Sequence, residues 1–165
     1  MEKLISTGPE KVIFLDIDGV LNSNRSTEPI IAEDMVKRLA HIARKTGASI
    51  VLSSSWRYEY ARHINSESDY YDKDVDCLII LLKKYGLEIA DITPLSYING
   101  ANARPYEIRT WLAGRANVKR FVILDDEFWL WNYLEDFVVC TMHMASGGIT
   151  TYGLQMMMLR KQLIF

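Results

Sequence analysis

The chain has 165 residues, of which 49% are hydrophobic and 24% are charged, and its formal net charge is −2. This composition is typical of an ordinary folded protein, and it argues against a disordered chain or a strongly basic nucleic-acid coat. No stretch approaches the roughly 20 apolar residues of a membrane span, and residues 1–11 lack the apolar core of a signal peptide. We expect one domain over residues 1–165, kept in the cytosol, although some exported proteins carry no such signal.

The first predicted element is a strand over residues 12–15. This apolar run is rich in β-branched and aromatic residues, which is typical of a strand covered on both faces in a parallel sheet. Asp16 follows at once, Asp18 comes two residues later, and Gly19 lets the backbone turn sharply. Because ligands in open α/β sheets bind beyond the carboxyl ends of the strands, the two carboxylates predict a site for a hard cation such as Mg²⁺. A plain acidic turn is the alternative.

Helix and strand then alternate. The apolar stripe over residues 33–45, with acids early and bases late, predicts a helix that ends at Gly47. Residues 48–52 predict a second buried strand. Small hydroxyl side chains follow it directly: Ser53, Ser54 and Ser55.

The middle of the chain continues this alternation. Residues 58–74 mix aromatic and charged side chains, and we expect a short helix followed by a loop. A helix is predicted over 75–85 and a third strand over 87–92. Pro105 suits the first turn of a further helix, which Gly114 ends.

The last part begins with a fourth apolar strand, over residues 118–124. We expect a fifth strand over 137–141, a loop over 146–148 and a final helix over 151–163. Such alternation predicts a parallel sheet covered by helices. Acids follow the fourth strand: Asp125, Asp126 and Glu127.

Polar side chains thus follow three of the predicted strands. In a parallel sheet those strand ends lie along one edge, so the two pairs of acids and the serines are expected to converge there. Arg104, at the start of a predicted helix, is placed to face the same edge. An ending without acids would serve the fold equally well, so this convergence indicates function.

These residues resemble the motifs of the haloacid dehalogenase (HAD) superfamily of phosphohydrolases. The motifs are DIDGVL at 16–21, VLSSSWR at 51–57, Arg104 and VILDDE at 122–127. The fragment RPYEIRTWL at 104–112 is similar to small members whose domains occur in Swiss Army Knife RNA repair proteins. The resemblance implies a three-layer Rossmann-like α/β fold with a five-stranded, mainly parallel sheet and helices on both faces. The short intervals between the motifs leave no room for a full cap domain.

The resemblance also implies roles for the acids. Asp16 would be the nucleophile that forms an aspartyl-phosphate, and Asp18 would act first as general acid and then as general base. Mg²⁺ would be held by Asp16, the backbone carbonyl of Asp18 and Asp125, with Asp126 as a direct or water-mediated ligand.

Two further roles concern the phosphoryl group. Ser53 would donate a hydrogen bond to its oxygens, with Ser54 or Ser55 as alternatives because strand ends are uncertain by a few residues. Arg104 would offset its charge, with Arg109 as the alternative five positions further along the helix.

An uncapped site would admit a large phosphorylated substrate, such as a nucleic-acid end, a phosphoprotein or a lipid headgroup. Residues 58–71 are expected to form a small lid. Trp56, Tyr58 and Tyr60 are candidates to stack on a base, although packing in the interior is favoured for Trp56.

The sequence therefore predicts a Mg²⁺-dependent phosphomonoesterase. The alternatives are a module that binds phosphate or phosphoprotein without turnover, and a phosphotransferase that passes the aspartyl-phosphate to another acceptor. Neither Cys77 nor Cys140 lies near a second ligand, so both are expected to be buried small hydrophobic residues. The physiological substrate and the oligomeric state are left open.

Overall fold

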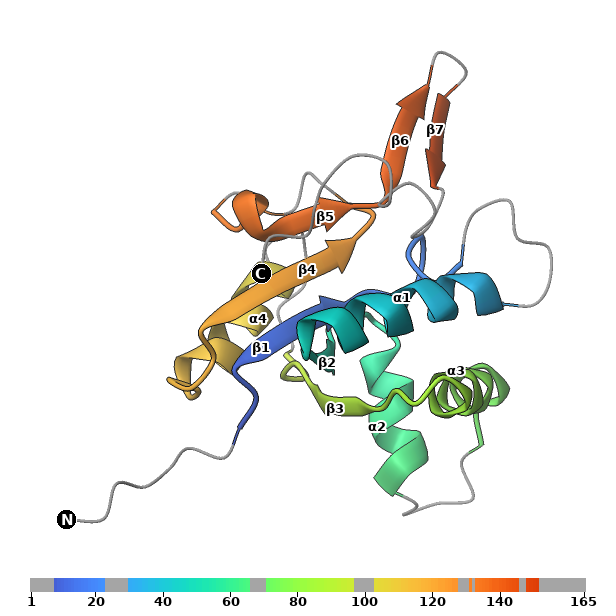
Figure 1. The fold of residues 1–165 in the computed structure, drawn as a ribbon, viewed down its shortest axis with the longest axis horizontal. Coiled ribbons are helices and arrows are strands. Elements are labelled where there is room, and N and C mark those ends of the chain that lie inside the picture. The colour runs from blue at the N-terminus through green and yellow to red at the C-terminus, as the bar shows by residue number, and fades with distance from the viewer. Residues whose placement is uncertain are drawn as a thin grey trace.

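The computed structural model describes residues 8–22, 30–65, 71–96, 103–127, 131, 133–145 and 148–151. Its centre is a five-stranded sheet in the order β3-β2-β1-β4-β5, and every neighbouring pair is parallel. This arrangement is Rossmann-like and confirms the predicted fold class (Figure 1). The strands are β1 (Lys11–Leu15), β2 (Ser49–Leu52), β3 (Ile89–Ile92), β4 (Arg120–Asp125) and β5 (Val138–Cys140).

Helices cover both faces of this sheet, as predicted. In Figure 1, α1 crosses in front of the strands and α4 lies behind them. Side chains of α1 and α3 pack with Ile13 and Leu15 of β1, whereas Ile108 and Trp111 of α4 pack with the alternate β1 residue Phe14. The helices are α1 (Glu33–Thr46), α2 (Arg57–Asn65), α3 (Lys73–Lys84) and α4 (Ala103–Ala113), with a 3₁₀ turn, η2, at Glu135–Phe137.

Local sequence explains where α1 begins and ends. Glu33 and Asp34 lie in its first turn and Arg44 and Lys45 in its last, so the charges oppose the helix dipole. Gly47 adopts a left-handed conformation with φ of 67° and donates its N–H to an α1 carbonyl, which ends the helix.

Helix α3 begins two residues before the predicted position. The side chain of Asp72 accepts hydrogen bonds from the backbone N–H groups of Asp74 and Val75, which caps the helix. Helix α2 occupies the first part of the predicted lid, and residues 66–70 of that lid lie outside the described residues. Within the described part of the chain, every helix is too short or too polar to cross a membrane.

The end of the chain differs from the prediction. Residues Met142–Ala145 form β6 and Gly148–Thr151 form β7, an antiparallel pair in which Met142 lies opposite Thr151. The predictions of a loop reaching Gly148 and a helix starting at Thr151 are therefore wrong at those positions. Pairing with β6 outweighs the weak local preference of Gly148 for a loop and of Thr151 for a helix. Ile149 and Thr150 are residue types that suit a strand. The remainder of the predicted helix lies outside the described residues.

The register of the sheet brings the strand ends together. Leu15 of β1 lies opposite both Leu52 and Leu124, so Asp16, Ser53 and Asp125 follow at the same level. The hydrogen-bond ladder continues beyond the strands, because the N–H of Asp16 donates to the carbonyl of Leu124 at 2.9 Å and that of Ser53 to Leu15 at 2.9 Å. The backbone that carries the polar side chains is thus as firmly held as the sheet itself.

Candidate active site

Three carboxylates meet at this edge. Oxygens of Asp16, Asp125 and Asp126 all lie within 4.8 Å of one another. Asp16 is 3% exposed and Asp125 fully buried, whereas Asp126 is half-buried. Convergent carboxylate oxygens are the donor set that Mg²⁺ prefers, so this acid cluster (Asp16, Asp125 and Asp126) fits a hard divalent cation.

The electrostatics of the acid cluster support this fit. Burial raises the pKa of Asp16, against the opposing effects of Arg104 and of a hydrogen bond from Ser54. Burial, with the neighbouring charge of Asp16, raises the pKa of Asp125 to about 7 and that of Asp126 to about 6. The three acids therefore resist simultaneous ionisation unless positive charge lies among them.

These shifts predict how stability depends on pH without divalent cations. In the unfolded chain Asp125 and Asp126 have their ordinary pKa of 3.8, so between about pH 4 and about pH 7 they bind more protons in the folded chain than in the unfolded one. The free energy of unfolding should therefore fall as pH rises from about 4 to about 7. Urea unfolding in a chelator across this range measures the slope. Asp126→Asn should flatten the slope, and a wild-type stability that rises across the same range would contradict the assignment.

Arg104 supplies positive charge to this cluster from the first turn of α4. Its Nη1 donates a hydrogen bond to Oδ2 of Asp125 and lies 3.4 Å from Oδ2 of Asp16. Burial lowers the pKa of Arg104, but Asp16 and Asp125 outweigh this effect and raise it above its ordinary value. The alternative, Arg109, is exposed, and its guanidinium carbon lies 5.1 Å from the centre of the Tyr133 ring. Of the two arginines, the structure places Arg104 at the acids.

The serines after β2 differ in their partners. Ser53 and Ser54 are both fully buried, whereas Ser55 is exposed. Interaction with Ser54 lowers the pKa of the Asp16 carboxylate. The hydroxyl of Ser53 has no hydrogen-bond partner among the described residues. A buried hydroxyl without a partner is destabilising, so the unpaired Ser53 hydroxyl is available to a ligand oxygen.

Asp18 is not a member of the acid cluster, but its charge contributes to the raised pKa of Asp16. Its side chain is exposed, and its Oδ2 accepts a hydrogen bond from Nε1 of Trp56 at 3.0 Å. Its Oδ1 accepts one from Nδ2 of Asn22, also at 3.0 Å. Trp56 was predicted to pack in the interior or to stack on a base, and nothing local in the sequence indicates that its indole reaches Asp18.

The backbone of Gly19, in the turn after β1, approaches the acid cluster closely. Its φ is +71°, and a Cβ built there would lie 2.3 Å from Oδ2 of Asp126. The carbonyl of Gly19 accepts a hydrogen bond from Oγ1 of Thr141 at 2.7 Å, while the N–H of Thr141 donates to the carbonyl of Asp125. This close approach requires glycine.

Replacing Gly19 by alanine should therefore destabilise the protein and displace Asp126. The positive φ alone costs about 1–3 kcal/mol, and the clash adds to it. Gly47→Ala is the matched control, because Gly47 has φ of +67° and nothing within 4 Å of a Cβ. Urea unfolding should show a larger loss for Gly19→Ala than for Gly47→Ala; equal losses would mean that the contact with Asp126 carries no weight.

A buried ion pair joins the serine loop, residues 53–55 after β2, to α4 through the adjacent Arg57. Arg57 and Glu107 are 5% and 1% exposed, and Nη2 of Arg57 lies 2.6 Å from Oε1 of Glu107. Nη1 of Arg57 donates to the carbonyls of Ser53 and Ser54 at 3.3 and 2.8 Å. The pairing of Arg57 with Glu107 was not predicted, although both residues lie in fragments that carry the family resemblance.

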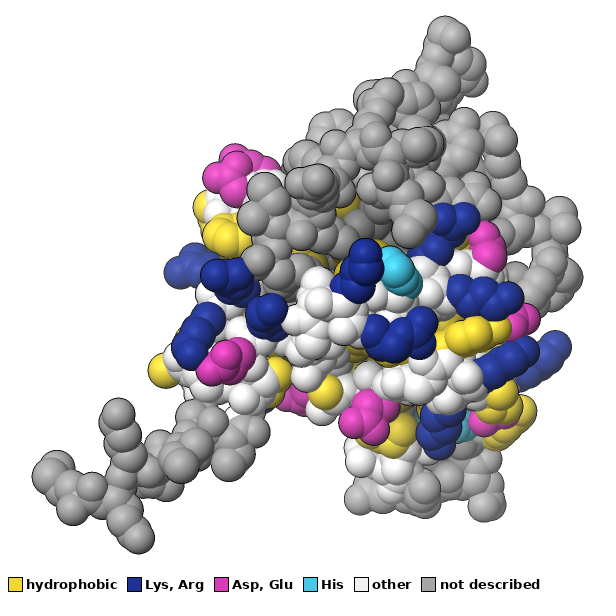
Figure 2. Space-filling model, viewed as in Figure 1, with side chains coloured by type: hydrophobic (Ala, Val, Ile, Leu, Met, Phe, Trp, Pro, Cys, Tyr) yellow, Lys and Arg dark blue, Asp and Glu magenta, His cyan; other side chains and the backbone are white. Residues whose placement is uncertain are grey.

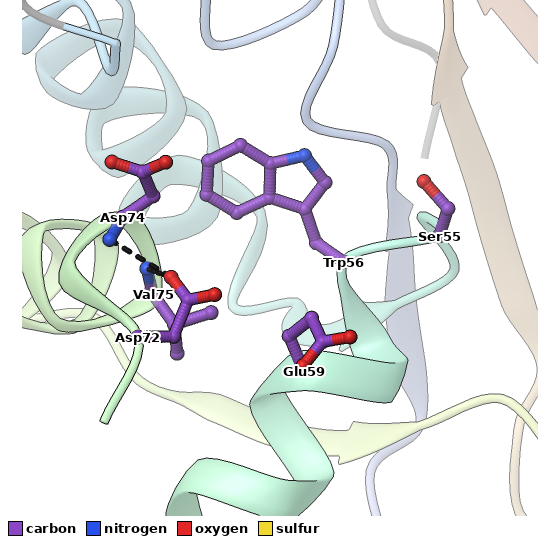
Figure 3. Close-up of a pocket in the computed structure, with 6 residues that line it drawn as sticks. All are labelled: Ser55, Trp56, Glu59, Asp72, Asp74 and Val75. Atoms are coloured by element: carbon purple, nitrogen blue, oxygen red, sulfur yellow. Dashed lines mark hydrogen bonds between the residues drawn. The ribbon is translucent and has the colours of Figure 1, made fainter. Parts of the chain in front are cut away.

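A pocket of about 270 Å³ adjoins the turn that leads into α2. Figure 3 shows the Trp56 indole projecting between Ser55 and Asp74, with Glu59 below it. Stacking of Trp56, Tyr58 or Tyr60 on a base stays a prediction. The pocket is lined by Ser55, Trp56, Glu59, Asp72, Asp74 and Val75.

Comparison with known families identifies the chain. The family described as the HAD domain in Swiss Army Knife RNA repair proteins matches residues 12–150. Comparisons with curated proteins and with solved structures found no match. Apart from Lys11 at the start of β1, the matched range contains the five strands of the parallel sheet, the acid cluster and Arg104. The chain therefore belongs to the family of HAD domains found in Swiss Army Knife RNA repair proteins.

Proposed function

We propose that the protein is a Mg²⁺-dependent phosphomonoesterase that acts through an aspartyl-phosphate. HAD domains are usually hydrolytic phosphatases, and the acid cluster fits Mg²⁺. The observation that carries the proposal is the setting of Asp16: a buried carboxylate at the end of β1, beside two further acids and a guanidinium.

In the first half-reaction, an oxygen of Asp16 attacks phosphorus, and a new oxygen–phosphorus bond forms as the bond to the leaving oxygen breaks. Asp18 gives its proton to that leaving oxygen. Arg104 and the hydroxyl of Ser53 hold the phosphoryl oxygens, and Ser54 keeps Asp16 oriented.

In the second half-reaction, Asp18 is a carboxylate and takes a proton from water. The water oxygen attacks phosphorus, so inorganic phosphate leaves and the carboxylate of Asp16 is restored. Asp16, Asp125, Asp126 and the backbone carbonyl of Asp18 would hold Mg²⁺, which when bound neutralises the charge of the phosphoryl oxygens.

A large substrate, such as a nucleic-acid end, is the class that we propose. The family name refers to RNA repair, and Figure 2 shows Lys, Arg and His side chains along the face over α1. Basic side chains on one face suit a phosphate backbone even in a chain of net charge −2. Basic residues of α1 that are exposed or half-exposed are Lys37, Arg38, His41, Arg44 and Lys45.

The test is hydrolysis of p-nitrophenyl phosphate with Mg²⁺ and with a chelator, followed by oligonucleotides carrying 3′- or 5′-phosphate, phosphopeptides and phosphorylated metabolites. We expect turnover that requires Mg²⁺ and is highest on an oligonucleotide end. Binding of phosphate without turnover would favour a binding module, and transfer to added alcohols would favour a phosphotransferase. Efficient turnover of small metabolites alone would contradict the large-substrate class.

A further inference from the structure

The carboxylate of Asp18 is held on both oxygens by donors from two different segments. Nδ2 of Asn22 donates to Oδ1 and Nε1 of Trp56 to Oδ2, each at 3.0 Å. The N–H of Gly19 donates to Oδ1 of Asn22 at 2.8 Å, so Nδ2 of Asn22 is the atom left to donate. An exposed aspartate would otherwise exchange rotamers freely, and these bonds fix its direction.

Trp56 is a rigid support for this purpose. It follows β2 closely in the chain, and its half-buried side chain packs against the core cluster that includes Ile13 and Leu15 of β1. In Figure 3 the indole nitrogen lies on the ring edge turned away from Asp74. One edge of the ring therefore holds Asp18 while another lines the pocket.

The chemistry of the two donors matters as much as their position. An indole N–H and an amide NH₂ only donate, so neither can accept a proton from Asp18. Each oxygen of Asp18 has a second lone pair, and the proton that the general acid carries must lie there. Trp56 therefore orients the carboxylate without competing for its proton.

We infer that Trp56 is a positioning residue that directs the proton of Asp18 to the leaving oxygen. This inference rests on the proposed function, because it assigns a support to the general acid of that reaction. It distinguishes two kinds of ester: an alkyl phosphate has a poor leaving group that needs the proton, whereas p-nitrophenyl phosphate leaves readily without it.

The experiment compares kcat/KM of wild type and Trp56→Phe on p-nitrophenyl phosphate and on 2-phenylethyl phosphate, an alkyl ester of similar shape. Phenylalanine keeps an aromatic ring and removes the N–H. We expect about a tenfold loss on the alkyl ester and less than about a twofold loss on the aryl ester. Because kcat/KM reports only the steps up to departure of the leaving group, the later role of Asp18 as base does not affect the comparison of the two esters.

Trp111→Phe is the matched control. Nε1 of Trp111 donates to Oδ2 of Asp91 at 2.8 Å, so the same substitution removes the same kind of bond elsewhere in the fold. This variant should change kcat/KM for both esters by the same factor. Replacing Trp56 by 3-benzothienylalanine, which keeps the indole shape and lacks the N–H, should reproduce the effect of Trp56→Phe even if phenylalanine disturbs folding.

Equal losses on the two esters for Trp56→Phe and for the benzothienyl variant, or no loss on either, would overturn the inference while leaving the proposed function intact. A wild-type protein that hydrolyses neither these esters nor an oligonucleotide with a terminal phosphate in Mg²⁺ would overturn the proposed function and the inference with it.

Discussion

The Asp16→Asn variant is expected to lose hydrolysis of p-nitrophenyl phosphate by about a thousandfold or more, because an amide cannot attack phosphorus. The fold should survive, because asparagine has the same shape as aspartate. Its neutral side chain also avoids the cost of burying a charge, which is the effect that raises the pKa of Asp16. Activity with Mg²⁺ and urea unfolding of the same preparation test both statements.

Asp34→Asn provides the control for this substitution. Asp34 is exposed in the first turn of α1, outside the site, so its replacement by asparagine should leave the rate unchanged. Full activity in Asp16→Asn would disprove the nucleophile assignment. Loss of activity together with loss of the cooperative unfolding transition would show a structural role for Asp16 instead.

Glu107→Ala is expected to reduce the free energy of unfolding by about 3–5 kcal/mol, because it leaves the buried guanidinium of Arg57 without its counter-ion. Ser96 loses its acceptor as well, since its hydroxyl donates to Oε1 of Glu107 at 2.6 Å. Urea unfolding measures the loss. The double variant Arg57→Met/Glu107→Leu should be more stable than Glu107→Ala, since it removes both charges and refills the space.

The surface pair between Lys119 and Glu10 offers a comparison. Its side chains are 67% and 64% exposed at an N–O distance of 2.7 Å, so Glu10→Ala should change stability far less. If Glu107→Ala proved as mild as Glu10→Ala, water would have to solvate Arg57, and the ion pair would not hold the serine loop to α4.

The parallel sheet and its acidic edge were predictable because they depend on local patterns. The apolar runs before Asp16 and Asp125 indicate buried strands, and the confirmed sheet order then places both acids at one edge. The hairpin of β6 and β7 was missed because its strands are defined by their pairing with each other rather than by a distinct alternation of residues.

The contacts within the site were less predictable because they join distant residues. Sequence alone left Arg104 and Arg109 as alternatives, and the course of α4 is what brings Arg104 to the acids. The bond from Trp56 to Asp18 and the pairing of Arg57 with Glu107 span 38 and 50 positions. Side-chain reach across such intervals depends on how loops pack, which periodicity does not encode.

The central place of β1 in the sheet constrains the order in which the protein can become functional. Asp16 is synthesised before β4, yet its strand pairs with β4, where Lys11 lies opposite Arg120, and Gly19 is bonded to Thr141 across 122 positions. These contacts close long loops and are expected to form late in folding. A partly folded chain that has paired only β1 with β2 would hold Asp16 without Asp125 and Asp126, so the acid cluster should be complete only after β1 has paired with β4.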